Sequence, residues 1–134
     1  MDPRHLQRIK IVQNLYAFSF AKHKPSSTFE KSQHKLPYPK DKNTKNIIQK
    51  LNEIDLIIKK FAPRYPLQNI ARTDLSIMRM CVYDLIFNKN MPVKVTIDEG
   101  VRLAKELSGE KSYAFINAVL GKILNESQSN PQGS

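Results

Sequence analysis

The sequence is poor in the residues that build covalent, metal and phosphate sites. Its 134 residues include one cysteine, Cys81, no tryptophan and four glycines. A single cysteine cannot form an intramolecular disulfide, which fits a reducing compartment. No glycine belongs to a GxGxxG or GxxxxGK(S/T) phosphate loop. His5, His23 and His34 share no metal-ligand spacing, so solvated histidines are expected. These shortages predict a protein that is not an enzyme and takes no metal or cofactor.

Long hydrophobic runs are also missing. The longest apolar stretch near the N-terminus, from Leu15 to Ala21, includes Ser19 and is too short to span a bilayer. No apolar segment with a cleavage site resembles a signal peptide. We therefore expect a soluble, cytoplasmic protein without a membrane partner, and the length predicts a single domain.

Positive charge is abundant and unevenly placed. The chain carries 22 Lys and Arg against 12 Asp and Glu, a formal net charge of +10. Residues 1–45 hold ten basic and three acidic side chains, whereas the remaining residues are nearly balanced. Such a balance favours polyanionic partners, and the polyanion-facing surface is expected toward the N-terminal third.

Hydrophobic periodicity predicts an all-α protein. The expected helices cover residues 3–23, 44–62, 72–88, 96–108 and 112–125, with one helical turn around 67–70. Prolines and scattered lysines predict a long irregular loop over 24–43, and residues 127–134 are expected to form a flexible tail. The helix over 72–88 is apolar nearly all round and is predicted to be central.

The first helix is apolar on two sides. Leu6, Ile9, Val12, Tyr16 and Phe20 follow one side, and Ile11, Leu15 and Phe18 follow the other. Such a helix is either sandwiched in a bundle or offers one side to a partner. The second alternative would make the protein an interaction scaffold, with a homodimer left open.

Three polar features have structural interpretations. The spacing from Thr96 to Glu99 is that of a capping box at a helix start. Arg79, in the apolar central helix, is expected to pair with Glu99 or Asp98. Cys81 is expected to be an inert core thiol.

The start of the first helix carries the clearest binding pattern. Basic groups supply phosphate contacts, while amide and aromatic side chains bind and stack on unpaired bases. The residues that fit these roles are Arg4, His5, Arg8, Lys10, Gln13 and Tyr16. A solvated basic helix end with Tyr16 in the core is an equally good interpretation of the pattern alone.

Three segments in the second half resemble the signature helices of the NusB family. They are Thr73–Leu85, Pro92–Lys105 and Phe115–Ile123, and their order and spacing match the family. The Arg-containing start and Val12-Gln13-Asn14-Leu15-Tyr16 are similar to the family's opening helix. The resemblance covers nearly the whole chain except residues 24–43.

The resemblance implies a compact bundle of about six to seven helices in two subdomains, placed here at residues 1–62 and 63–126. It also implies binding of boxA-type RNA in nascent ribosomal RNA leaders together with NusE, in support of an RNA polymerase antitermination complex. Arg4, His5, Arg8, Gln13 and Tyr16 fall on the family's first RNA-contact region. Phe115 and the loop before it, which includes Lys111, fall on its second, and Asp74 on an acidic position near the partner surface.

Two departures and one alternative accompany the resemblance. Lys111 replaces a commonly acidic residue, which strengthens attraction to phosphate, and Ala118 replaces a glycine. The alternative is a stand-alone RNA-binding domain of the type appended to RNA cytosine methyltransferases. The principal expectation is a positively charged edge where the opening helix meets the loop ahead of the closing helix.

Overall fold

The computed structural model describes residues 2–21, 29 and 35–129 of the chain. In chain order, the described elements are α1 (Pro3–Ala21), α3 (Lys42–Gln49), α4 (Leu51–Phe61), η2 (Leu67–Asn69), α5 (Arg72–Val82), η3 (Tyr83–Asn88), α6 (Val93–Leu107) and α7 (Glu110–Ser129). Here η2 is a 3-10 turn and η3 a π-helix. The described residues contain no strand, and the all-α prediction is confirmed. None of the described helices is long and apolar enough to cross a membrane.

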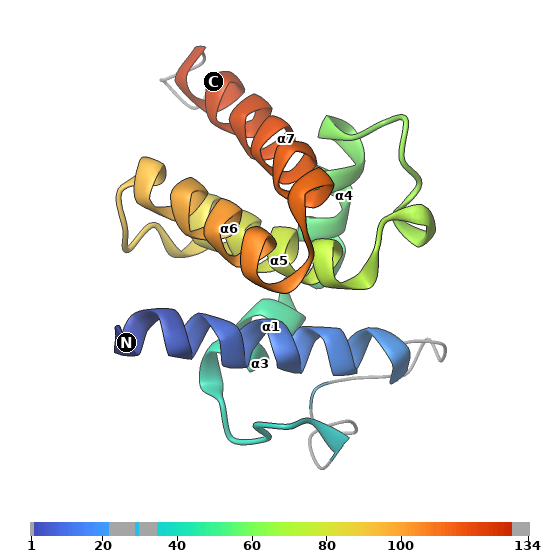
Figure 1. The fold of residues 1–134 in the computed structure, drawn as a ribbon, viewed down its shortest axis with the longest axis vertical. Coiled ribbons are helices and arrows are strands. Elements are labelled where there is room, and N and C mark those ends of the chain that lie inside the picture. The colour runs from blue at the N-terminus through green and yellow to red at the C-terminus, as the bar shows by residue number, and fades with distance from the viewer. Residues whose placement is uncertain (1, 22–28, 30–34, 130–134) are drawn as a thin grey trace.

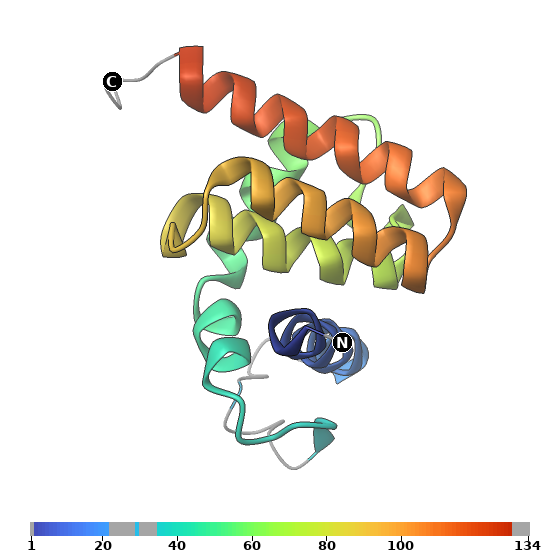
Figure 2. The ribbon, with the colours of Figure 1, turned by 60° about the vertical axis from the view of Figure 1, so that its left-hand side comes forward.

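The helices stack around α5. Figure 1 shows α1 running across the molecule below α5 and α6, with α3 behind it and α7 above. Figure 2 shows the same order from another side, with α5 and α6 between α7 and α1. The most extensive contacts join α6 with α7, α1 with α5, and α5 with α6. Because α4 also packs on α5 and α7, it lies with the later helices; the division at residue 62 stays a prediction.

Helix α5 forms the centre of the hydrophobic core. Nine consecutive residues, from Asp74 to Val82, are buried, so no side of this stretch of the helix faces solvent. Leu15 of α1, Ile54 of α4, Leu103 of α6 and Leu120 of α7 belong to the same buried cluster. The apolar circumference that predicted a central helix therefore has neighbours all around it.

Of the two apolar sides of α1, the one through Leu15 is buried. Ile11, Leu15 and Phe18 are each at most 6% exposed. On the other side, Tyr16 is 42% and Phe20 46% exposed. The stripe that was considered for an interaction scaffold is thus occupied by the protein's own core, and the aromatic end of the opposite side faces solvent.

Asn14 fixes the segment before α3 against α1. It is completely buried, and its Nδ2 donates hydrogen bonds to the Tyr38 carbonyl at 2.9 Å and to Thr44 Oγ1 at 2.8 Å. Its Oδ1 accepts a bond from the Tyr38 N–H at 2.8 Å. The end of the expected 24–43 loop is therefore anchored. Most of the remainder of that loop, with His34, lies outside the described residues, as do His23 and residues 130–134.

The helix expected over 44–62 is divided at Lys50. Asp41 starts α3 earlier than expected, because its Oδ2 accepts a hydrogen bond from the Thr44 N–H at 2.8 Å. Lys50 has φ −104° and ψ 11°, outside the helical region, and separates α3 from α4. No proline or glycine marks this break, so the hydrophobic periodicity alone predicts one continuous helix.

The predicted capping box at Thr96 is wrong. Helix α6 begins at Val93, directly after Pro92, so Thr96 lies within the first turns and its buried hydroxyl has no hydrogen-bond partner among the described residues. Glu99 instead faces α1. Helix α7 also starts earlier than expected, at Glu110 rather than at residue 112, directly after Gly109, whose φ is 138°.

The expected partner of Arg79 is also corrected. Arg79 is 4% exposed and its Nε and Nη2 donate to the two carboxylate oxygens of Asp55, each at 2.9 Å. The ion pair therefore joins α5 to α4, whereas Glu99 and Asp98 lie on α6. The prediction of a partly buried ion pair holds with a different carboxylate.

Candidate nucleic-acid interface

Two exposed aromatic rings lie at the C-terminal half of α1. Tyr16 and Phe20 are four residues apart and therefore adjacent on the helix surface, with ring centroids 5.0 Å apart and an interplanar angle of 72°. The guanidinium of Arg72 lies 4.2 Å from the Phe20 ring centroid. Its Nη1 donates to the Ser19 carbonyl at 2.8 Å, which holds the cation against the ring.

A second aromatic pair lies at the start of α7. Phe115 packs against Tyr65 of the α4–η2 connection, with centroids 4.9 Å apart at 66°. Tyr65 is 50% exposed. The exposed Lys111 lies one turn before Phe115 and borders the same shallow cavity of about 210 Å³. Rings with exposed surface beside a cation offer stacking and charge together.

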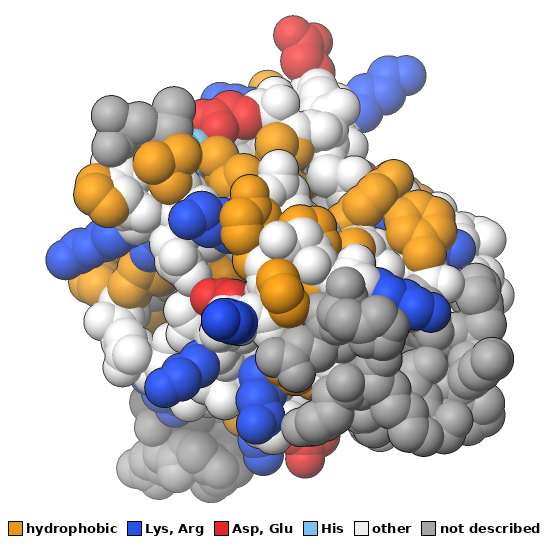
Figure 3. Space-filling view, turned by 90° about the horizontal axis from the view of Figure 1, so that it is seen from below, with side chains coloured by type: hydrophobic (Ala, Val, Ile, Leu, Met, Phe, Trp, Pro, Cys, Tyr) orange, Lys and Arg blue, Asp and Glu red, His pale blue; other side chains and the backbone are white. Residues whose placement is uncertain are grey.

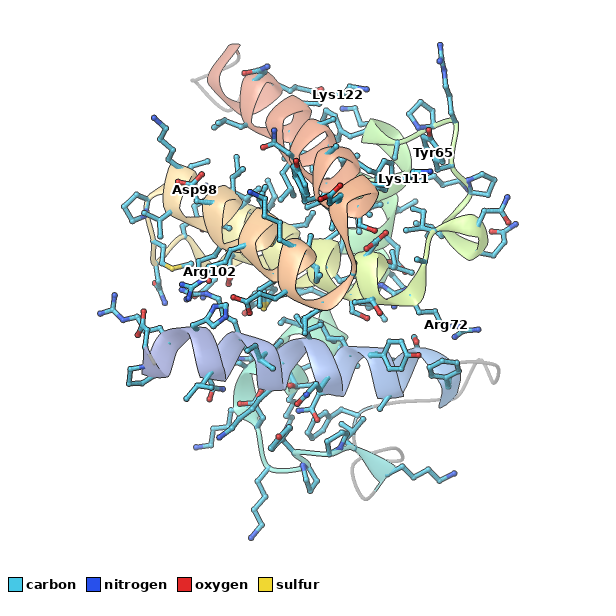
Figure 4. All side chains as sticks on the ribbon, in the orientation of Figure 1. Tyr65, Arg72, Asp98, Arg102, Lys111 and Lys122 are labelled. Atoms are coloured by element: carbon cyan, nitrogen blue, oxygen red, sulfur yellow. The ribbon has the colours of Figure 1, made fainter. Side chains whose placement is uncertain are left out.

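Asp74 connects the two pairs. It lies two residues after Arg72, is 6% exposed, and its Oδ2 accepts a hydrogen bond from Ser112 Oγ at 2.9 Å. Its Oδ1 is buried without a partner among the described residues. The Asp74–Ser112 bond joins the start of α5 to the start of α7. In Figure 4, Arg72, Tyr65 and Lys111 lie on the same side of the molecule.

We refer to these six side chains as the aromatic face: Tyr16, Phe20, Tyr65, Phe115, Arg72 and Lys111. Four rings contribute stacking surface and two cations contribute charge. Single-stranded nucleic acids are held by this combination, because every base has a π-face and every nucleotide a phosphate.

The N-terminal end of α1 is built differently. Arg4 is exposed, but His5 is completely buried. The Nε2 of His5 lies 2.8 Å from Glu106 Oε2, and its Nδ1 lies 3.2 Å from Glu99 Oε2. The bond to Glu106, helped by that to Glu99, raises the pKa of His5 although burial opposes it. His5 therefore fastens α1 to α6, and its predicted contact with RNA stays a prediction.

Arg8 is largely turned inward as well. Its side chain is 12% exposed, Nη1 lies 3.8 Å from Glu99 Oε2, and Nη2 donates to the Met91 sulfur. Lys10 remains exposed, with Nζ 5.4 Å from the Tyr38 ring centroid. The basic start of α1 thus offers fewer free cations than its sequence suggests.

The predicted contact residues are therefore divided between exposed and buried positions. Those exposed are Arg4, Lys10, Gln13, Tyr16 and Lys111; those half-buried are Arg8 and Phe115; those buried are His5 and Asp74. The predicted single edge is also extended, because Arg4 and the Tyr16–Phe20 pair occupy opposite ends of α1. Phe20 lies 16 positions after Arg4, which corresponds to roughly 24 Å of helix.

Basic side chains continue beneath α1. The face in Figure 3 presents Lys and Arg side chains among hydrophobic ones, with few acidic groups. This distribution agrees with the excess of positive charge in the N-terminal third of the sequence. It provides an attractive potential for a polyanion on this side of the molecule.

Three members of the aromatic face were missed by the sequence analysis as binding residues: Phe20, Tyr65 and Arg72. The four-residue spacing of Tyr16 and Phe20 was a usable signal, because such pairs meet on a helix. Tyr65 had no such signal in the sequence, because its partner Phe115 is fifty positions away. Arg72 likewise meets Phe20 only through the packing of α1 on α5.

The described residues offer no obvious reaction centre. They contain no group of three or more His, Cys, Asp or Glu side chains able to hold a metal ion. Cys81 is buried, and burial raises the pKa of its thiol far above the usual range, so the sulfur stays protonated.

Comparison with known proteins gives consistent results. The transcription antitermination protein NusB of Clostridium botulinum (strain Kyoto / Type A2) is 44% identical over 80 residues, which are 60% of this chain and 56% of the relative. The chain thus spans little more than half the length of the curated relative. The relatives' names describe antitermination proteins, in agreement with the prediction that the chain is not an enzyme.

Solved structures extend the likeness to nearly the whole chain. Thermotoga maritima NusB matches with a TM-score of 0.75 and 26% identity, covering 93% of this chain and 92% of that one. A chain in the crystal structure of antitermination factors NusB and NusE in complex with dsRNA matches with a TM-score of 0.70 over 93% and 99%. At 24% identity this second likeness shows the fold alone.

The family comparison covers the helices that carry the aromatic face. The model of the NusB family matches residues 5–125, from the first turn of α1 through most of α7. The chain therefore belongs to the NusB family.

Proposed function

We propose that this protein is a non-catalytic, RNA-binding transcription antitermination factor that holds single-stranded, boxA-type RNA on its aromatic face. The observation that carries the proposal is the pair of edge-to-face ring contacts, Tyr16 with Phe20 and Tyr65 with Phe115, each beside a cation. The relatives' printed name, transcription antitermination protein NusB, supports the biological role.

Charge and stacking contribute to RNA binding in different ways. Cations such as Lys111 and Arg72 attract phosphates and make the affinity depend on salt. Exposed rings then hold bases by stacking. Unpaired bases are available for this contact, whereas the bases of a regular duplex are already stacked on one another. The bases of a single strand that crosses from Phe20 to Phe115 would meet ring surface at both ends.

The proposed partners follow from the family. A related NusB chain occurs with NusE and dsRNA in a crystal structure. We propose that this protein also binds NusE, with the Asp74 region at the partner surface, and that the pair supports an RNA polymerase antitermination complex in the cytoplasm. Arg4, Lys10 and Gln13 are proposed to contact the RNA as secondary sites beyond the aromatic face.

The experiment is a fluorescence anisotropy titration of a labelled single-stranded boxA-type RNA over a range of salt concentrations. Phe115→Ala should weaken binding by about 1–3 kcal/mol, the contribution of one stacked base. Leu56→Ala is the matched control, because it removes an apolar side chain that is 66% exposed on α4, outside the aromatic face.

Charge is tested in the same titration. Lys111→Gln should reduce the slope of log affinity against log salt by about 0.7, the value for one phosphate contact of a single strand. Lys122→Gln, an exposed lysine farther along α7, should leave the slope unchanged. If Phe115→Ala and Lys111→Gln both bind like the parent protein at every salt concentration, the proposed interface is wrong.

A further inference from the structure

A cavity among the described residues lies away from the aromatic face. It has a volume of about 540 Å³ and is enclosed by the first turns of α1, the start of α3 and the segment from η3 to α6. Arg4 and Arg8 line it from α1, and Tyr83 and Asp84 from η3. This volume lies within the range typical of small-ligand pockets.

Asp84 gives the cavity a hydrogen-bond acceptor. Its Oδ1 accepts a hydrogen bond from Asn88 Nδ2 at 3.3 Å, and its Oδ2 has no hydrogen-bond partner among the described residues. Burial raises the pKa of Asp84, while the bond from Asn88 and the charge of Arg8 act in the opposite direction. A carboxylate that has already lost part of its hydration gains more from a ligand's N–H donors than a solvated one.

The walls suit a flat, partly polar ring. Tyr83 borders the cavity, and its ring stacks on Phe87 with centroids 6.0 Å apart and an interplanar angle of 30°. Ile11 and Ile47 supply apolar surface on the other elements. Amide side chains complete the lining: Gln7, Asn43, Asn88 and Asn90.

Positive charge borders the same space. Arg4 is exposed and makes no ion pair with any described side chain. Arg8 lies 3.8 Å from Glu99 and is therefore partly neutralised. A ligand with N–H donors at one end and a phosphate at the other would satisfy both Asp84 and Arg4.

We propose that this cavity is a guanine-specific nucleotide site, in which the Asp84 carboxylate accepts hydrogen bonds from guanine N1–H and N2–H while Arg4 contacts the phosphate. Among the four common bases, only guanine presents two adjacent donors on its Watson–Crick edge. A carboxylate has two acceptor oxygens and no donor, so it complements that edge and no other. Adenine, cytosine and uracil each place an acceptor where the second donor would be needed.

The inference rests on the proposed function, since it identifies a base that the bound RNA presents at the N-terminal end of α1. The site lies at the opposite end of that helix from the Tyr16–Phe20 pair. One single strand engaging both regions would therefore be fixed in register by its guanine, while the aromatic face holds other bases without selecting them.

The direct test uses the full chain and mononucleotides, followed by amide chemical shifts. GMP should bind with shifts at residues 83–91 and in the first turns of α1, and AMP, CMP and UMP should bind more weakly. IMP, which retains N1–H but lacks the 2-amino group, should bind on the order of ten-fold more weakly than GMP. This comparison needs no variant, so it does not depend on a substitution being tolerated.

Two variants test whether the Asp84 carboxylate makes the contact with guanine. Asp84→Asn keeps the shape of the side chain and should remove the preference for GMP over IMP. Asp98→Asn, which neutralises an exposed carboxylate on α6, should retain it and serves as the charge-matched control. Equal affinities of the parent protein for all five nucleotides, or an unchanged preference in Asp84→Asn, would overturn the inference.

A parallel RNA titration separates this inference from the proposed function. Replacing guanine by inosine in the boxA-type RNA should weaken binding to the parent protein and leave binding to Asp84→Asn unchanged. RNA that binds equally well with guanine and with inosine refutes the guanine site but leaves the proposed function standing. Absence of RNA binding altogether refutes the proposed function.

Discussion

The buried ion pair between Arg79 and Asp55 allows a sharp test of how the core is held together. Both hydrogen bonds are 2.9 Å long, and Arg79 is only 4% exposed. Asp55→Ala would remove both carboxylate oxygens and leave a cation in a place that water hardly reaches. Breaking a buried pair in this way costs about 3–5 kcal/mol, a large share of the roughly 5–15 kcal/mol that stabilises an ordinary domain.

The assay is urea unfolding followed by far-ultraviolet circular dichroism. An exposed ion pair gives the comparison: Lys60 Nζ lies 2.8 Å from Glu126 Oε1, with the two side chains 64% and 51% exposed. Lys60→Ala should lower the free energy of unfolding by less than about 1 kcal/mol, because solvent screens such pairs. The double variant Asp55→Leu with Arg79→Met, which leaves no charge behind, should recover most of the stability lost in Asp55→Ala. A loss in Asp55→Ala no larger than that in Lys60→Ala would refute this reasoning.

Three further outcomes are expected. The His5–Glu106 pair should stabilise the fold most between the ordinary pKa values of 4.5 and 6.5. Its contribution should fade as the pH falls through the lowered pKa of Glu106 or rises through the raised pKa of His5. The measurement is the difference in melting temperature between the parent and His5→Gln across pH, and a difference that does not change with pH would contradict this expectation. Gly100→Ala should cost about 1–3 kcal/mol, because the new Cβ would lie 2.7 Å from Cys81 Sγ, and adding Cys81→Ala should restore part of the loss in urea unfolding. Lys89→Gly should leave stability unchanged or raise it by up to about 1 kcal/mol in the same assay, since Lys89 has φ 47°; a clear loss would show that the lysine side chain matters.

The sequence was most informative where a pattern depends on nearby residues. The continuous apolar circumference from Leu75 to Leu85 identified the central helix, and Pro63 and Gly109 lie just beyond the ends of α4 and α6. These signals are local, since they concern the surroundings of a single helix or a single peptide unit. They predicted the order and type of the elements.

Features that depend on packing between distant segments were not predictable in this way. The partner of Arg79 is 24 positions earlier in the chain. The capping box at Thr96 failed because Pro92 starts α6 one turn earlier, which leaves the threonine hydroxyl inside the protein. The spacing of Thr96 and Glu99 shows that these side chains could cap a helix, but it does not determine the residue at which the helix begins.

In the candidate site, too, the sequence identified some residues, while the packing between helices decided which of them are exposed. Tyr16, Lys111 and Phe115 were identified through the family resemblance, and the structure places them on the aromatic face. His5 shared the basic composition of its neighbours but is enclosed by two glutamates of α6. Composition indicates that a helix end carries charge, and only the packing decides which charges reach solvent.

The complete enclosure of α5 has a consequence for how the molecule opens. Its residues from Asp74 to Val82 are covered by α1, α4, α6 and α7, so no partial detachment of one outer helix exposes the whole of it. Its amide protons should therefore exchange with deuterium more slowly than those of any other helix, and at a rate set by unfolding of the entire molecule.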